Sequence, residues 1–350
     1  MGSEAIIAGE ELFPIPLAVM QPGTLAPVNL YIIYQNPAHF ILYKRAQAAL
    51  REETRVRLLA HGVDRLYVRK KDEHSYYGYV EQNIHAIIRD DLLPVETAAK
   101  LVYESSSRVM QATLEDPRSG RNLKRAHSMV EATVQSILKD PDTLWHMTAM
   151  ATHDYYTYTH CVHVCMFLVT AARDLLGISD ARMLKVIGLG GMFHDIGKSQ
   201  IPEAILNKPG RLTDDEFRAI QEHPALGANL VQHDKKLGRV ALQIVRCHHE
   251  HFDGGGYPRG LAGEGIGRLS RLATIVDVYD ALTTKRSYAP ARDPYRACEL
   301  MLNQMSAEFD EPLLRGFVKF LGPRPMRLEL RSRWDPTVVV PAEEPTAAQA

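Results

Sequence analysis

The chain has 350 residues, with 41 Lys and Arg against 42 Asp and Glu and a formal net charge of −1. This balance gives no basic excess for binding a DNA or RNA polymer, and the length is enough for two domains with buried cores. Four scattered cysteines exclude a disulfide framework. The N-terminus lacks the basic segment of a signal peptide, and the longest apolar runs are too short to span a membrane. A soluble, cytoplasmic protein is therefore expected.

The first 140 residues predict a small α+β domain. Short runs of aromatic and β-branched residues are typical of strands and occur at residues 29–34, 39–44 and 65–70. Segments between and after these runs have apolar residues at helical spacing, at residues 45–62, 76–93, 94–117 and 122–140. The region contains no glycine-rich phosphate loop, so we expect a regulatory or dimerising role for it.

The sequence of residues 141–325 has a nearly continuous helical period, which predicts a second, all-α domain. Apolar-periodic segments predict helices at residues 160–177, 181–195, 239–251 and 269–283. Thr213 and Glu216 have the spacing of a capping box, so another helix is expected to begin there. The tail, residues 326–350, is rich in small residues and proline and is expected to be partly disordered.

Histidines concentrate in the second domain, where ten of the 15 lie between His146 and His251. Several of them, with two aspartates, lie near the ends of the predicted helices: His160, His194, Asp195, His223, His248, His249 and Asp277. One such histidine alone is more often a core residue than a ligand. A whole set of buried imidazoles and carboxylates needs a partner for its charge, and a metal ion supplies one. Nitrogen and oxygen donors without thiolate suit iron, manganese or zinc and do not suit a structural zinc site.

Five motifs carry a family resemblance. They are "HDIGK" (194–198), "IPEAILNKPGRLTDDEF" (201–217), "HP" (223–224), "HHEHFDGGGYP" (248–258) and "DVYDALTTKRSY" (277–288). In this order and separation they resemble the HD-GYP family of HD-superfamily phosphohydrolases, over about residues 145–320. The resemblance implies an all-α HD-GYP helical domain and a bacterial phosphodiesterase of cyclic di-GMP. The region before it resembles an uncharacterised domain that often precedes HD-GYP modules.

The resemblance implies a binuclear metal centre, with iron as the expected metal and manganese or another divalent metal as alternatives. One ion would be held by His160, His194, Asp195 and Asp277, and Asp195 would bridge to a second ion held by His223, His248 and His249. The implied reaction is attack by a bridging hydroxide that opens the cyclic dinucleotide to linear pGpG. Tyr156 stands one turn before His160, where some members have a Glu for a third metal. Two ions per chain, and slow or no formation of GMP, are therefore expected.

The resemblance also implies roles around the metals. Lys198 would contact the scissile phosphate as a point charge and serve catalysis together with Asp195. The substrate would be bound by Gly256 and Tyr257, and Arg286 would engage a phosphate or a guanine. The glycines of this loop would let the backbone approach a ligand closely, and Glu250 would orient the paired histidines. Two further acidic positions near the family's pocket are Asp154 and Asp280, each of which could equally be a helix cap or a surface carboxylate.

Departures from the family pattern keep two alternatives open. His251 replaces the usual Arg after "HHE", and Ala289 replaces a basic residue often found near the Arg286 site. Altered contacts there would suit another cyclic dinucleotide, such as cyclic GMP-AMP. The second alternative is a catalytically weak module that binds cyclic di-GMP and signals to a partner protein, although Lys198 and all the ligands are present. A homodimer through the N-terminal domain or the connecting helices is a further expectation.

Overall fold

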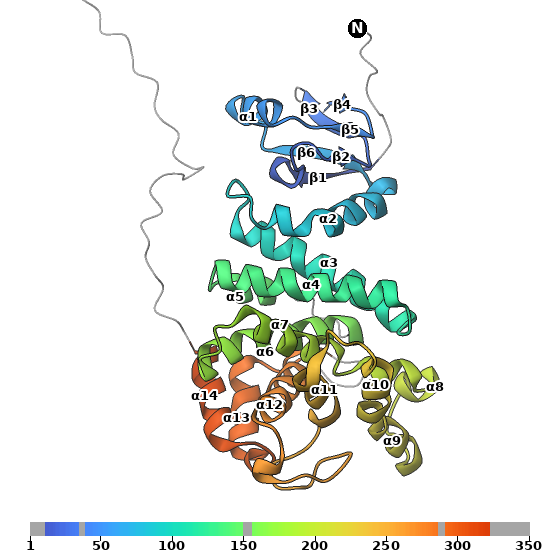
Figure 1. Ribbon diagram of the computed structural model, residues 1–350, viewed down its shortest axis with the longest axis vertical. Helices are drawn as coiled ribbons and strands as arrows, with labels where there is room; N and C mark the ends of the chain where they lie inside the picture. Colours follow the sequence, from blue (N-terminus) through green and yellow to red (C-terminus); the bar gives the residue numbers. More distant parts are fainter. Residues whose placement is uncertain (1–10, 35–38, 150–155, 286–290, 323–350) are drawn as a thin grey trace, which may run out of the picture. The chain divides into compact units, whose positions relative to one another are not determined.

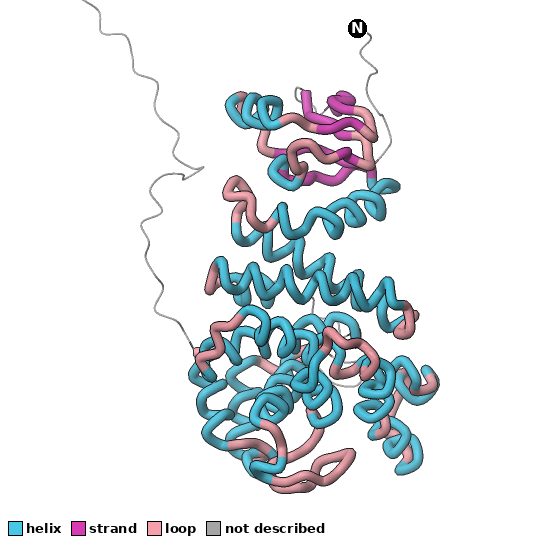
Figure 2. The backbone as a smooth tube through the Cα atoms, viewed as in Figure 1, coloured by secondary structure: helices cyan, strands magenta, loops and turns pink. Residues whose placement is uncertain are grey.

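The N-terminal part is built on short strands, as the aromatic and β-branched runs predict. The computed structural model describes residues 11–34, 39–149, 156–285 and 291–322 (Figure 1). Its strands are β1 (Leu12–Pro16), β2 (Leu25–Ala26), β3 (Leu30–Tyr34), β4 (His39–Lys44), β5 (Ala48–Ala49) and β6 (Arg65–Arg69). Within the described residues, β1, β6, β3 and β4 form one antiparallel sheet in that order, and β2 pairs with β5. All described strands precede residue 70 (Figure 2).

Two local features differ from the sequence-based expectations. β1 was not expected, because Pro14 and Pro16 interrupt its apolar run. It lies at an edge of the sheet, pairing with β6, and an edge strand tolerates proline because one side needs no ladder donors. The helix expected at residues 45–62 is confined to α1 (Glu52–Ala60). Gln47 adopts a positive φ of 63°, which a continuous right-handed helix cannot contain.

The rest of the described chain is helical, which confirms the fold class of an all-α domain with a smaller α+β part before it. In chain order its first helices are α2 (Glu73–Ile87), α3 (Val95–Glu115), α4 (Gly120–Lys139), α5 (Thr143–Ala149), α6 (Thr157–Leu176) and α7 (Ala181–Phe193). They are followed by α8 (Glu203–Leu206), α9 (Asp214–Gln221), α10 (His223–Val231), α11 (Gly238–Cys247), α12 (Arg268–Thr283), α13 (Pro294–Asn303) and α14 (Glu311–Leu321). Thr213 caps α9 in a capping box with Glu216, as their spacing predicts.

α6 lies at the centre of the helical packing. Every residue from Thr159 to Ala172 is buried, as expected of a helix enclosed on all sides, and α6 packs against α3, α7 and α12. Its contact with α7 is close because Gly191 faces it: a Cβ at this position would lie 2.9 Å from the Cα of Cys165. This close packing brings the C-terminal end of α7 near the first turns of α6.

The domain limits expected from the sequence stay predictions. α3 and α4 belong to the expected N-terminal domain, yet α3 packs against α6, and α4 packs against α7. Met1–Phe320 form one compact unit, distinct from Leu321–Ala350. The expected disordered tail, 326–350, lies outside the described residues, as do Asp154, Arg286 and Ala289. Within the described part of the chain, no helix is both long enough and apolar enough to cross a membrane.

Candidate metal centre

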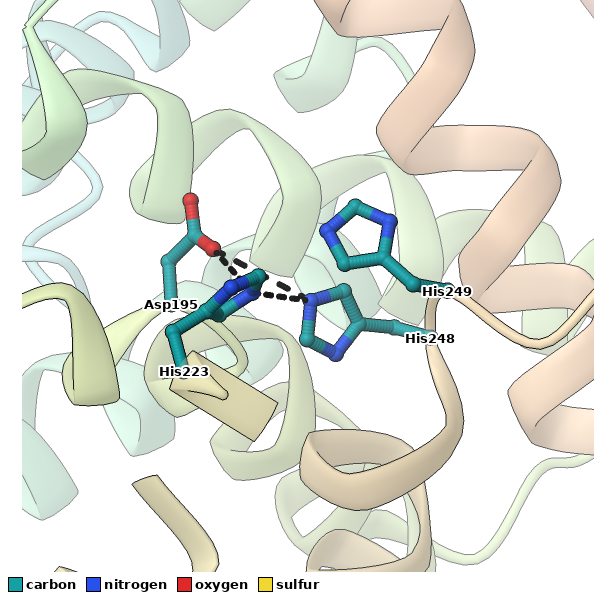
Figure 3. A group of neighbouring side chains, drawn as sticks. All are labelled: Asp195, His223, His248 and His249. Atoms are coloured by element: carbon teal, nitrogen blue, oxygen red, sulfur yellow. Dashed lines mark hydrogen bonds and ion pairs between the residues drawn. The ribbon is translucent and has the colours of Figure 1, made fainter. Parts of the chain in front are cut away.

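The structure brings the seven predicted ligands together from α6, α10 and α12 and from the residues that follow α7 and α11. They form a first group, His160, His194 and Asp277, and a second group, Asp195, His223, His248 and His249. Within each group the candidate donor atoms lie within 4.8 Å of one another. In Figure 3 the rings of His223 and His248 are turned toward Asp195. The first group contains three of the four ligands expected for one ion, and the second contains all four expected for the other, while the ions themselves stay a prediction.

Asp195 lies between the two groups, with one carboxylate oxygen toward each. Its Oδ2 is 3.4 Å from Nε2 of His194 and 3.6 Å from Nε2 of His160. Its Oδ1 is 3.2 Å from Nε2 of His223 and 3.9 Å from Nε2 of His248. A carboxylate placed in this way can bridge two ions, as the resemblance implies.

Three of the ligand histidines each lie at the end of a helix. His194 follows α7, His248 follows α11, and His223 lies at the junction of α9 and α10. Each Nδ1 lies near the carbonyl oxygen three residues earlier, at 2.7 Å for His194 and His223 and 3.0 Å for His248. The last carbonyls of a helix have no partner within it. Because a carbonyl oxygen only accepts, Nδ1 carries the proton, and Nε2 keeps the lone pair that a metal needs.

These lone pairs face one another, which shows that a cation fits the site. Nε2 of His223 is 3.1 Å from Nε2 of His248, and Nε2 of His194 is 3.1 Å from Nε2 of His160. Two lone pairs at such a distance repel unless a cation lies between them. The aspartates Asp195 and Asp277 are also buried, and buried carboxylates need positive partners. The donor set of imidazoles and carboxylates is one that binds iron, manganese or zinc.

The electrostatic environment keeps the donors in their metal-binding forms. Burial opposes the charge of Asp195, but Lys198 and His194 hold the pKa of its carboxyl well below the ordinary value. Burial likewise opposes the charge of Asp277, but the neighbouring imidazoles of His160, His249 and His194 hold its pKa well below the ordinary value. Burial lowers the pKa of His248 far below that of a free imidazole. An ionised carboxylate and a neutral imidazole are the forms of these side chains that bind metals.

Lys198 lies at the edge of the centre on the 3₁₀ helix η3 (Ile196–Gln200). Its Nζ donates to Oδ2 of Asp195 at 2.6 Å, and 18% of the side chain is exposed. Gly197 permits this position, because a Cβ there would lie 1.9 Å from the carbonyl oxygen of His223. The ammonium group therefore lies beside the carboxylate that is expected to bridge the two ions. Its contact with a phosphate stays a prediction.

The glycine-rich loop differs from two expectations. Gly256 was expected to give a ligand room, but a Cβ there would lie 2.2 Å from the backbone nitrogen of His251 and 2.4 Å from the carbonyl oxygen of His249. The chain's own backbone therefore requires this glycine. Glu250 was expected to orient the histidines, which is wrong: its carboxylate accepts hydrogen bonds at 2.9 and 2.8 Å from the backbone N–H groups of Arg259 and Leu261. It fixes the loop instead.

Tyr257 extends this loop to the second group. Its ring stacks on the imidazole of His249, with the centroids 4.7 Å apart and the planes at 30°. The His249 side chain is 22% exposed, so the stacked pair lies on the open side of the centre. This position agrees with a contact to a nucleotide, which stays a prediction.

Asp280 was expected either near the substrate pocket or as a helix cap or surface carboxylate, and the structure places it elsewhere. It is 2% exposed, so it is neither a surface carboxylate nor a group at the substrate. Its two oxygens accept from Nδ1 of His160 at 2.7 Å and from Nδ1 of His163 at 2.9 Å. Burial raises its pKa, but His163 and His160 lower it further, so the carboxyl is ionised. Asp280 thus supports a metal ligand.

His163 was missed in the sequence, although a signal was present. It follows His160 by three residues in a helix, just as Asp280 follows Asp277 by three. Such pairs share a helix face, so two ligand helices with paired polar positions predict a supporting layer behind the ligands.

Tyr156 is the N-cap of α6 with 53% exposure. Its phenol is stacked with Tyr158 at 5.2 Å rather than packed in the core.

Comparisons with known proteins agree with the motifs and the fold. The HD domain family matches residues 142–313. The cyclic di-GMP phosphodiesterase PA4108 of Pseudomonas aeruginosa is 36% identical over 230 residues, which are 65% of this chain and 55% of that protein. The 3'3'-cGAMP-specific phosphodiesterase 3 of Vibrio cholerae is 34% identical over 166 residues, 47% of this chain and 35% of that protein. The chain thus spans about half or less of the length of these curated relatives.

One solved structure shares the fold over most of the chain. The Bdellovibrio bacteriovorus protein Bd1817, described as an HDG"Y"P protein, aligns with a TM-score of 0.60 and 21% identity, covering 89% of this chain and 99% of that one. At this identity the likeness supports the fold alone. The matched HD domain and the curated relatives identify residues 142–313 as an HD domain, and the ordered motifs support its assignment to the HD-GYP family.

Proposed function

We propose that this chain is a metal-dependent phosphodiesterase that hydrolyses cyclic di-GMP to linear pGpG. The observation that carries the proposal is the position of Asp195, whose two oxygens face two separate groups of nitrogen and oxygen donors. A relative with a long aligned region is named a cyclic di-GMP phosphodiesterase. Two metal ions, for which iron is our first choice and manganese the second, would supply hydroxide at neutral pH and offset charge on the phosphoryl group.

The chain's own residues supply the remaining functions. Asp195 joins the two donor groups, and Lys198 offers a positive charge beside it for the phosphate oxygens, where charge increases during the reaction. Tyr257 offers an aromatic face next to His249, on which a base can stack. The carboxylate of Glu250 keeps this loop in place through two backbone hydrogen bonds. Arg286 remains our candidate for a further phosphate or guanine contact.

The product follows from the number of ions. Among the described residues, the clusters able to hold a metal are the two groups named above. Tyr156 provides an exposed phenol at the start of α6, and a phenol oxygen is a weaker metal ligand than a carboxylate. A centre with two ions would bind the terminal phosphate of a linear dinucleotide less tightly than a centre with three ions. A second cleavage to GMP should therefore be slow.

A product time course tests the proposal. Anaerobically purified protein is analysed for metals and incubated separately with cyclic di-GMP and 3'3'-cGAMP, and the products are resolved by chromatography. We expect two ions per chain and pGpG from cyclic di-GMP at the higher kcat/KM. A higher kcat/KM for 3'3'-cGAMP would favour the activity that the Vibrio relative's name describes. Bound metals without turnover of either compound would favour a binding module, and GMP formed as fast as pGpG would contradict the proposed product.

A further inference from the structure

A chain of buried hydrogen bonds connects α3 to the first metal group. The hydroxyl of Tyr103, on α3, is 3.0 Å from Nε2 of His163 on α6. Nδ1 of His163 is 2.9 Å from Oδ1 of Asp280 on α12, and Oδ2 of Asp280 is 2.7 Å from Nδ1 of the ligand His160. All four side chains are buried, with Tyr103 the most exposed at 6%. This series of hydrogen bonds therefore joins three helices. It ends on Nδ1 of His160, the ring nitrogen that faces away from the metal groups.

The chemistry of the four groups fixes the direction of every bond. An ionised carboxylate only accepts, so Nδ1 of both histidines donates to Asp280. In a neutral His163 the other nitrogen, Nε2, can then only accept, and the hydroxyl of Tyr103 is the donor. Burial and the charge of Asp280 raise the pKa of Tyr103 to about 12, which keeps the phenol protonated. With Nδ1 of His160 donating, its Nε2 is left as the lone pair directed at the metal groups.

We propose that Tyr103 and His163 are positioning residues for the metal ligand His160, acting through Asp280, so that α3 is coupled to the metal centre. The inference rests on the metal centre of the proposed function and adds two residues that do not touch the ions. Tyr103 also stacks on His163, with the ring centroids 5.6 Å apart and the planes at 13°. The imidazole is thus held both in its plane and in its tautomer, which in turn fixes the carboxylate that orients His160.

The expected effect is on metal affinity. Losing a partner that orients a ligating histidine typically weakens metal binding about 10–100-fold. Asp280 is such a direct partner of His160, whereas His163 and Tyr103 act one and two hydrogen bonds further away. We therefore expect about a tenfold loss for His163→Asn, and about a threefold to fivefold loss for Tyr103→Phe, which removes only the hydroxyl.

The test uses the full chain and Mn²⁺ as the probe metal. Dissociation constants are measured by competition with a chelator for the wild type, Tyr103→Phe, His163→Asn and the double variant, without nucleotide. Tyr77→Phe is the matched control, because that hydroxyl donates at 2.8 Å to Glu104, on the same helix α3, outside the chain that leads to Asp280. Urea unfolding of the metal-free variants measures stability separately.

Coupling predicts a pattern that loss of stability alone does not. Tyr103→Phe should weaken Mn²⁺ binding in the wild type, should cause no further loss in the His163→Asn background, and should exceed Tyr77→Phe in its effect. Equal metal affinity of Tyr103→Phe and the wild type would overturn the proposal, as would equal effects of Tyr103→Phe and Tyr77→Phe. Additive losses in the double variant would overturn the route through His163. Because no nucleotide is used, failure of this inference is distinguishable from failure to hydrolyse cyclic di-GMP.

Discussion

The two metal groups differ in the partner of one histidine. In the first group, His160 donates to the buried carboxylate of Asp280, and His194 donates to a backbone carbonyl. In the second group, His223 and His248 donate to neutral backbone carbonyls at helix ends. The first group is buried throughout, whereas His249 of the second group has a partly exposed side chain stacked against Tyr257.

This difference predicts that the two groups bind their metal ions with different affinity. An ionised partner makes an imidazole a stronger donor than a neutral carbonyl does, so we expect the first group to bind its ion more tightly. The second group lies beside the glycine-rich loop, where the side chain of His249 is partly exposed. Asp195 connects the two, and the predictions below begin with it.

Asp195→Ala should have the largest effect, because both groups share this carboxylate. We expect activity at background level and the loss of at least one ion per chain, measured by product chromatography and metal analysis. Asp215→Ala is the control, since that aspartate has an 88% exposed side chain and pairs with Arg218, whose side chain is also exposed. A variant of Asp195 that kept two ions and full activity would show that the site assignment is wrong.

Lys198→Ala should preserve both groups while removing the charge at their edge. The loss of one preorganised group that stabilises developing charge typically costs about 10²–10³ in kcat, and we expect a reduction of that size with two ions still bound. Lys208→Ala is matched, because its Nζ also contacts a carboxylate, that of Glu216, at 2.6 Å. Arg286→Ala should act mainly on KM; small and equal effects at Lys198 and Arg286 would place neither at the phosphate.

The ligands could be predicted from the sequence because their residue types and spacing carry the chemistry. Helix-period segments ending in His and Asp already indicate a helical metal site, and the structure brings all seven residues together. The helix ends were less predictable. Helices expected to reach residues 195 and 251 end at Phe193 and Cys247, because the histidine that follows each one bonds back to the last turn.

The supporting contacts could not be predicted, since they depend on tertiary neighbours. Glu250 is adjacent to the ligand His249, yet it accepts from backbone groups nine and eleven residues later. The resemblance places Asp280 at an acidic position near the family's pocket, whereas the packing of α12 on α6 turns it to His160 and His163. A single sequence shows which residues can bind metals more readily than it shows what orients them.

Chelator titration of the purified protein should resolve the two groups. We expect metal content to fall from two ions to one at a lower chelator concentration than is needed to remove the last ion, because the second group lacks an ionised partner like Asp280. Asp280→Asn should weaken the tighter site by about 10–100-fold and reduce or reverse the separation. Loss of both ions in a single step from the wild type, with no change in Asp280→Asn, would remove the difference on which the comparison depends.

The smallest effect concerns the stability of the metal-free protein as a function of pH. Burial lowers the pKa of His249 to about 3 and that of His248 well below 6.5. Between about pH 6.5 and the lowered values, the unfolded chain binds protons that the folded chain does not, so the free energy of unfolding falls as pH falls. Each histidine contributes about 1.4 kcal/mol per pH unit well below pH 6.5, and the contribution is complete above that pH.

The carboxylates of the centre act in the same direction but at lower pH. The pKa values of Asp195 and Asp277 are lowered in the fold, so their contribution is present above about pH 4 and is lost only below it. Urea unfolding at pH 7.5, 6.5 and 5.5 with chelator present therefore isolates the imidazoles. The doubly substituted chain, His248→Gln with His249→Gln, should show a clearly shallower slope than the wild type, because both residues belong to the second group. Equal slopes in the two proteins would mean that these imidazoles are hydrated and protonated in the fold, contrary to a buried set of ligands kept ready for metal.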